Sequence, residues 1–131
     1  MPIQVHPTVI DKTRAFEKSV VFDKRVALAR VGGLQDVLHD VLELMVTESP
    51  KVHAEIGAAL NRRDPVGLRR SAHTLMGSVS LLGATDLVDR LRRLERFAAA
   101  EEFGSAAVEV DEIDRRFSEL QQLLIAELRP V

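Results

Sequence analysis

The feature that most constrains the fold is a stripe of apolar residues in the middle of the chain. Between Asp64-Pro65 and Gly83, apolar residues recur at alternating steps of four and three, the spacing of one face of an α-helix. Aspartate followed by proline is a typical helix start, and glycine is a typical helix end. The pattern predicts a helix from Asp64 to about Leu82 that is anchored by one side only. The stripe consists of Leu68, Ala72, Leu75, Val79 and Leu82.

Comparable stripes predict the other helices. Asp23 is predicted to cap a short helix that reaches Arg30 and is broken by Gly32-Gly33. The remaining predictions are a long helix from Leu34 to about Asn61, bent or interrupted near Pro50, a helix that begins at Ala84 or Thr85, a helix from about Ser105 to Leu128, and a short N-terminal helix from Thr8 to about Ser19. On the helix that begins at Ala84 or Thr85, Arg90 and Arg93 are predicted to point mostly outward.

These elements define the expected architecture. Leu, Ala, Glu and Arg are plentiful, whereas no stretch alternates apolar and polar residues long enough to form a sheet. Short connections between long helices predict antiparallel neighbours. We therefore predict an all-α fold: residues 1–20 are an arm with a short helix, and residues 21–131 form an antiparallel up-down four-helix bundle.

Composition excludes several function classes. The chain has 131 residues, no cysteine and a net charge of −2, and it lacks Trp and Tyr. These features argue against thiol chemistry, cysteine metal sites, charge-driven nucleic-acid binding and base stacking. The four histidines show no metal-ligand spacing, and no apolar run is long enough to span a membrane. We expect a cytoplasmic, monomeric protein without a metal or cofactor.

His73 is the candidate functional residue. At about 100° per residue it lies roughly 140° from the centre of the apolar stripe, so its imidazole is predicted to point outward. Residues on the same side of the helix are Arg69, Arg70, Met76, Gly77 and Ser80. Gly77 costs the helix about 1 kcal/mol relative to alanine and leaves space beside the ring. An exposed histidine alone is typical of a solvated surface, so a functional role for His73 depends on the wider motif.

The sequence Ala72-His73-Thr74-Leu75-Met76-Gly77-Ser78, with Leu82-Gly83-Ala84 after it, resembles the signature of histidine-containing phosphotransfer (HPt) domains. The resemblance covers about residues 20–128. It implies that His73 carries a phosphoryl group between aspartates of response-regulator receiver domains. The implied partners are these receivers and a hybrid sensor kinase, and magnesium and its acidic pocket belong to the receiver.

The resemblance also assigns supporting residues. Glu95, 22 residues after His73, matches a glutamate that accepts a hydrogen bond from the ring in chemotaxis-kinase relatives. The family usually has lysine where this chain has Met76, and Arg69 and Arg70 are placed to supply the missing positive charge. No G-x-x-x-x-G-K-S/T loop is present, so we expect a carrier that neither binds ATP nor phosphorylates itself.

Three alternatives stay open from the sequence. The chain is a phosphoryl carrier, or it is an adaptor that binds receivers but transfers poorly because Met76 replaces lysine. The third is a helical interaction module, which an outer apolar patch of Val66, Met76 and Leu81 would favour. Glu95 pairs either with His73 or with an arginine such as Arg92, and Arg62, Arg63, Arg69 and Arg70 form either a docking flank or a solvated face.

Overall fold

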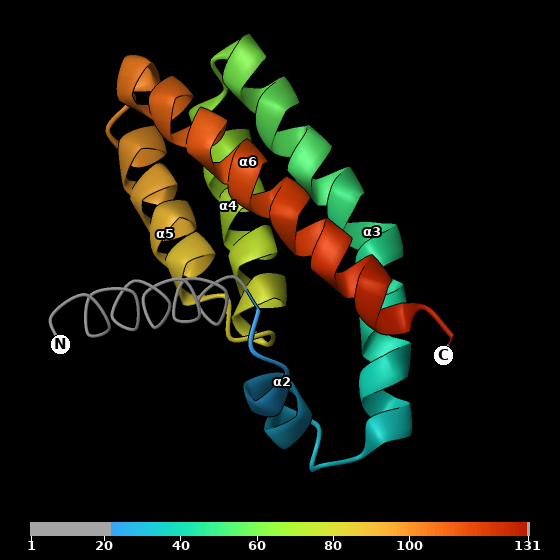
Figure 1. Cartoon of the computed structure of the whole chain (residues 1–131). Coiled ribbons are helices and arrows are strands. Elements are labelled where there is room, and N and C mark those ends of the chain that lie inside the picture. The colour runs from blue at the N-terminus through green and yellow to red at the C-terminus, as the bar shows by residue number, and fades with distance from the viewer. Residues whose placement is uncertain (1–21, 131) are drawn as a thin grey trace, which may run out of the picture.

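Four long helices form an antiparallel up-down bundle, and a short helix lies across one end of it (Figure 1). The computed structural model describes residues 22–130. Within them, α4 packs between α3 and α5, and α6 closes the ring against α3 and α5. The all-α bundle is confirmed, whereas the N-terminal helix predicted from Thr8 to Ser19 lies outside the described residues. The helices are α2 (Lys24–Arg30), α3 (Gln35–Arg62), α4 (Pro65–Ser80), α5 (Thr85–Ala99) and α6 (Phe103–Leu128).

The core is built from the predicted apolar stripes. Every member of the stripe in α4, and Leu82 after it, is at most 1% exposed. The inner residues of α5 and α6 are at most 4% exposed; they are Leu87, Leu91, Leu94, Ala98, Ile113, Phe117, Leu120 and Leu124. Of the helices in residues 22–130, none has both the length and the apolar character needed to cross a membrane.

Aspartates begin α2 and α4, as predicted. Asp23 Oδ1 accepts hydrogen bonds from the backbone N–H groups of Arg25 and Val26, and Asp64 Oδ1 accepts one from Gly67 at 3.0 Å. The Gly67 bond lowers the pKa of the Asp64 carboxyl. A Cβ on Gly67 would lie 2.4 Å from that carboxylate, so the cap needs glycine there.

The sequence predicted that α3 is bent or interrupted near Pro50, and the structure shows the bend without the interruption. The helix runs unbroken from Gln35 to Arg62, and its two halves point in different directions in Figure 1. Proline has no N–H, so the carbonyl of Val46 loses its usual helical donor. Gln121 of α6 donates its side-chain Nε2–H to that carbonyl at 3.4 Å. A bond from a neighbouring helix thus replaces the one that proline removes.

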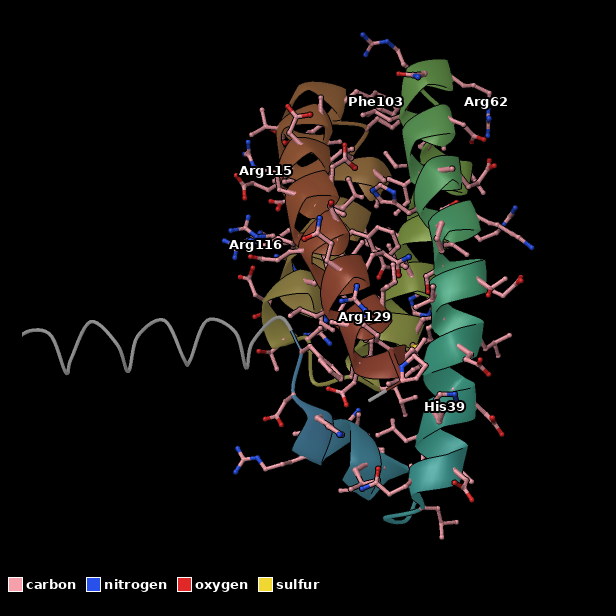
Figure 2. All side chains as sticks on the ribbon, turned by 45° about the vertical axis from the view of Figure 1, so that its right-hand side comes forward. His39, Arg62, Phe103, Arg115, Arg116 and Arg129 are labelled. Carbon is pink, nitrogen blue, oxygen red and sulfur yellow. The ribbon has the colours of Figure 1, made fainter. Side chains whose placement is uncertain are left out.

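A charged cluster joins α5 to α6, which the sequence did not predict. We expected Arg90 and Arg93 to point mostly outward, yet both contact Glu109 of α6, which is only 8% exposed. Arg90 Nη1 donates to Glu109 Oε2 at 3.1 Å, and Arg93 Nε lies 3.2 Å from Oε1. Arg90 Nε also donates to Asp86 at 3.2 Å. Figure 2 shows Arg115 and Arg116 on the side of α6 away from α3.

The turn between α4 and α5 holds α2 in place. The backbone N–H of Asp23 donates to the Leu82 carbonyl at 2.9 Å, and Arg30 Nη1 donates to the Ser80 carbonyl at 2.7 Å. Gly83 has φ +70°, and a Cβ there would lie 3.0 Å from Asp23 and 3.1 Å from Val26. Glycine is therefore required both by the backbone conformation and by the close approach of α2.

We expect Gly83→Ala to lower the free energy of unfolding by about 2 kcal/mol, because alanine resists positive φ and meets α2. Urea denaturation followed by circular dichroism measures the change. Gly57→Ala is the matched control: this glycine is in a helix, and its Cβ would meet no atom within 4 Å. The control should be neutral or stabilising by up to about 1 kcal/mol. Equal stability of the two variants would contradict the role assigned to Gly83.

Candidate functional site

His73 projects from the outer face of α4. Its side chain is 71% exposed, whereas Ala72 and Leu75 beside it are fully buried. The helix is thus held by one side while the imidazole faces solvent, as the periodicity predicted. A partner can therefore reach the ring without any rearrangement of the bundle.

Glu95 of α5 contacts the ring. Both of its carboxylate oxygens lie 3.3 Å from His73 Nδ1, and its side chain is 21% exposed. Arg92, the alternative partner, instead lies 3.7 Å from Asp89. With the proton on Nδ1, the ring donates to Glu95 and keeps the lone pair of Nε2 available.

Two of the four flanking arginines, Arg69 and Arg70, lie beside His73. Arg69 and Arg70 line one open depression together with Val66, His73, Thr74 and Glu95. Within residues 22–130, neither arginine forms an ion pair or a side-chain hydrogen bond. Their guanidinium groups are therefore available to an anionic ligand at His73.

The other two arginines, Arg62 and Arg63, form contacts at one end of the bundle. Arg62 Nη2 donates to Glu55 at 3.1 Å and to Asp64 at 3.4 Å, and the bond to Glu55 raises the pKa of the Arg62 guanidinium. Arg63 lies over the Phe103 ring at 5.6 Å. Figure 2 shows Arg62 and Phe103 at the same end of the molecule. The predicted flank of four arginines is thus divided into two pairs.

Three predicted site residues that follow His73 on α4, Met76, Gly77 and Ser80, differ in their surroundings. Met76 is partly buried against the core, so its side chain does not stand free beside the ring. Gly77 is exposed, and a Cβ there would meet nothing within 4 Å. The Ser80 hydroxyl donates to the Gly77 carbonyl at 2.9 Å, and the Ser80 carbonyl accepts from Arg30. Ser80 is therefore engaged in ending the helix, whereas Gly77 leaves open space near the imidazole.

Sequence reasoning missed Thr74, which lines the same depression. It also treated Val66 only as part of a possible apolar patch with Met76 and Leu81. That patch is not continuous, because Met76 and Leu81 are partly buried against the core while Val66 is 60% exposed. Whether a residue lines the depression between two helices depends on where the neighbouring helix lies. The periodicity of a single helix does not give that position.

The other described histidines are placed differently. His53 stacks on Phe117 with ring centroids 4.4 Å apart, and its Nε2 lies 2.6 Å from Asp114. His39 lies 3.7 Å from Glu43 one turn along α3. In the part of the chain that the structure describes, no three His, Asp or Glu side chains gather as metal ligands would.

Comparisons with known proteins agree with this arrangement. A family profile described as "Hpt domain" matches residues 40–129. The crystal structure of histidine-containing phosphotransfer protein B (HptB) from Pseudomonas aeruginosa PAO1 is similar, with 27% identity, a TM-score of 0.75, and coverage of 82% of this chain and 93% of that one. The HPT domain of a sensor hybrid histidine kinase from Shewanella has the same fold, with 14% identity, a TM-score of 0.75, and coverage of 84% and 95%. No curated protein sequence gives a significant match.

Proposed function

The chain belongs to the Hpt domain family, and on that premise we propose that His73 accepts a phosphoryl group from one receiver-domain aspartate and donates it to another. The observation that carries the proposal is the 71% exposed imidazole with a carboxylate 3.3 Å from Nδ1. Such a ring is accessible, held in one tautomer and nucleophilic at Nε2. The partners are receiver domains, including that of a hybrid sensor kinase, and the carrier works as a monomer in the cytoplasm.

The transfer step follows from this geometry. The Nε2 lone pair attacks the phosphorus of an aspartyl phosphate, the bond between phosphorus and the aspartate oxygen breaks, and the aspartate leaves as a carboxylate. The proton on Nδ1 stays in its hydrogen bond to Glu95, whose negative charge offsets the positive charge of the phosphorylated ring. Donation to a second receiver is the reverse of this step. The protein contributes positioning and electrostatic stabilisation, as is usual in phosphoryl transfer.

Positive charge near the phosphoryl oxygens comes from α4. Arg69 and Arg70 lie four and three residues before His73, which places them one helical turn away on its two sides. Met76 occupies the position at which the family usually has lysine, and it contributes no charge. The two arginines therefore take over the role of that lysine in this proposal. The chain is a carrier: the donor is an aspartyl phosphate in the first transfer and the phosphorylated His73 in the second.

The experiment that tests the function is phosphoryl transfer from purified, phosphorylated receiver domains. Acid-labile label that moves to the chain and then to a second receiver supports the relay. A receiver that binds but does not donate favours the alternative function, a receiver-binding adaptor. This alternative is motivated by Met76, whose apolar side chain replaces a cation.

We expect Glu95→Gln to slow transfer about tenfold, because a charge-assisted hydrogen bond is roughly twice as strong as a neutral one. Rapid-quench measurement at saturating receiver isolates this step from binding. Glu119→Gln is the control, because it removes the same charge at an exposed position on α6. It should leave the transfer rate unchanged. An unchanged rate in Glu95→Gln would contradict the role assigned to the carboxylate.

We expect Met76→Lys alone to change the transfer rate less than about threefold, because Arg69 and Arg70 already supply cations. Replacing both arginines with glutamine should slow transfer about tenfold, and Met76→Lys should restore much of that loss. A lysine stem can stay on the core while its ammonium reaches solvent. A large gain from Met76→Lys in the otherwise unchanged chain would show instead that the missing lysine limits transfer.

A further inference from the structure

The first half of α3 extends past the end of α4. The two helices are antiparallel neighbours joined at Arg63-Asp64, and α3 has 28 residues whereas α4 has 16. About twelve residues at the start of α3, or about 18 Å of helix, therefore have no part of α4 beside them. Figure 1 shows this part of α3 beyond the last turn of α4.

An apolar row on this part of α3 is exposed. It consists of Leu34, Val37 and Val41, whose spacing of three and four residues puts them on one side of the helix. Leu34 is 58% exposed and Val37 is 40% exposed, and Val41 is half-buried against the core. Ala59, about five helical turns after Val41 on the same side, is fully buried. This side of α3 is therefore covered at one end of the helix and open at the other.

The described chain begins close to the open part of α3. Phe22 packs against the core, and the backbone N–H of Asp23 donates to the carbonyl of Leu82, just after α4. Residues 1–21 therefore join the bundle at the end of α4, where the uncovered half of α3 starts. The sequence predicts a helix from Thr8 to about Ser19, which is about twelve residues or 18 Å long. Its length equals that of the uncovered half of α3.

The apolar side of this predicted helix has the same spacing as the apolar row. Val9 and Phe16 are seven residues apart, as Leu34 and Val41 are. A helix that ends beside the last turn of α4 runs parallel to α3, so its first residues lie near the start of α3. In that direction Val9 is level with Leu34, and Phe16 is level with Val41. After Ser19 the chain turns away from α3 toward Phe22, which leaves Leu44 exposed.

Charge and area argue against a second copy of the chain on the apolar row. Between Gln35 and Ser49, α3 has four carboxylates and no lysine or arginine. A two-fold contact would bring these carboxylates against their own copies. A row of three side chains also provides far less than the about 800 Å² per partner of a standard interface. The carboxylates are Asp36, Asp40, Glu43, which lies 3.7 Å from His39, and Glu48, which lies 3.0 Å from Lys51.

A segment of the same chain meets neither difficulty. Residues 8–19 contain three basic and two acidic side chains, so their net charge is opposite to that of the first half of α3. Because the segment is covalently attached, its docking is intramolecular and needs no large interface. The basic residues are Lys12, Arg14 and Lys18, and the acidic ones are Asp11 and Glu17.

We infer that residues 8–19 form a helix that packs parallel to the first half of α3 and covers the apolar row. This helix continues the line of α4 and gives the overhanging end of α3 the neighbour that it lacks. The residues that line the depression at His73 come from α4 and α5 and none from α3. The inference is therefore independent of the proposed function.

Engineered disulfides in the full chain test the position of the segment directly, since the chain has no cysteine of its own. Thr13 is level with Val37 in the proposed arrangement, so Thr13→Cys with Val37→Cys should form an intramolecular disulfide. The control is Thr13→Cys with Leu44→Cys, whose partner lies seven residues further along α3, about 10 Å away and beyond disulfide reach. Oxidation in dilute solution, followed by mass spectrometry, should be at least about tenfold faster for the first pair.

Hydrogen exchange provides a second readout without cysteines. Amides of residues 8–19 should be protected in the unaltered chain, because a docked helix opens rarely. Val37→Asp places a carboxylate in the apolar row and should reduce that protection at least about fivefold. Leu44→Asp adds the same charge to α3 at a side chain that is 61% exposed, and it should leave the protection unchanged.

Three results would overturn the inference. Equal oxidation rates for the two cysteine pairs would show that the segment has no fixed place on α3. Unprotected amides in the unaltered chain, or equal losses from the two aspartate variants, would refute a docked helix. Concentration-dependent self-association that disappears in Val37→Asp would assign the apolar row to a second copy of the chain.

Discussion

We expect His73→Ala to remove phosphoryl transfer completely while the bundle stays folded. The substitution deletes the proposed nucleophile, so acid-labile label from a phosphorylated receiver should fall to background. Because the side chain is 71% exposed, the free energy of unfolding should change by no more than about 0.5 kcal/mol. Transfer assays and urea denaturation on the same preparation measure both effects.

His39→Ala is the matched control for that experiment. His39 is also an exposed histidine on a helix, with a side chain 53% exposed, and it lies on α3 away from the seam between α4 and α5. It should accept label at the original rate. Label that persists on His73→Ala and disappears in His39→Ala would reassign the phosphorylated residue.

A substitution two residues after His73, at Leu75, should have the opposite effect: a large loss of stability with transfer retained. Leu75→Ala should lower the free energy of unfolding by about 3 kcal/mol, because it leaves a cavity at a side chain that is fully buried. For a domain of this size the melting temperature should fall on the order of 10 °C. At low temperature, where the variant remains folded, transfer to His73 should persist.

Leu44→Ala separates cavity formation from a general effect of shortening leucine. Leu44 is 61% exposed on α3, so its truncation should cost no more than about 0.5 kcal/mol. Thermal melts of the two leucine variants side by side provide the comparison. Together with His73→Ala, they separate the outward, reactive side of α4 from its inward, structural side. Similar melting temperatures for Leu75→Ala and Leu44→Ala would contradict the burial described for Leu75.

Sequence patterns predicted the parts of this molecule that depend on a single helix. Periodicity placed Leu75 inward and His73 outward, and local turn chemistry placed the caps at Asp23 and Asp64, because both depend on residues at most a few positions apart. The contact between Glu95 and His73 was a different case. It was implied by the family resemblance, since periodicity gives no distance between two helices.

The features that the sequence did not reveal depend on distant partners. The sequence left open whether α3 is bent or interrupted near Pro50, and the unbroken helix is accompanied by a hydrogen bond from Gln121, which is 75 residues away from Val46. Arg90 was expected outside because arginine usually faces water, but a buried Glu109 on the next helix binds it. A helical wheel shows which side a residue is on, and it does not show what stands opposite.

The Glu109 cluster has a consequence for the reactive ring on the other side of α5. Arg90 and Arg93 hold α5 to α6 through one carboxylate, and Glu95, two residues further along α5, reaches His73 on α4. A slip of α5 by one helical turn, about 5.4 Å, would separate both sets of partners at once. The contacts of α5 with α6 therefore fix the axial register of α5. The position of the Glu95 carboxylate beside the imidazole depends on a charge cluster that Glu95 does not touch.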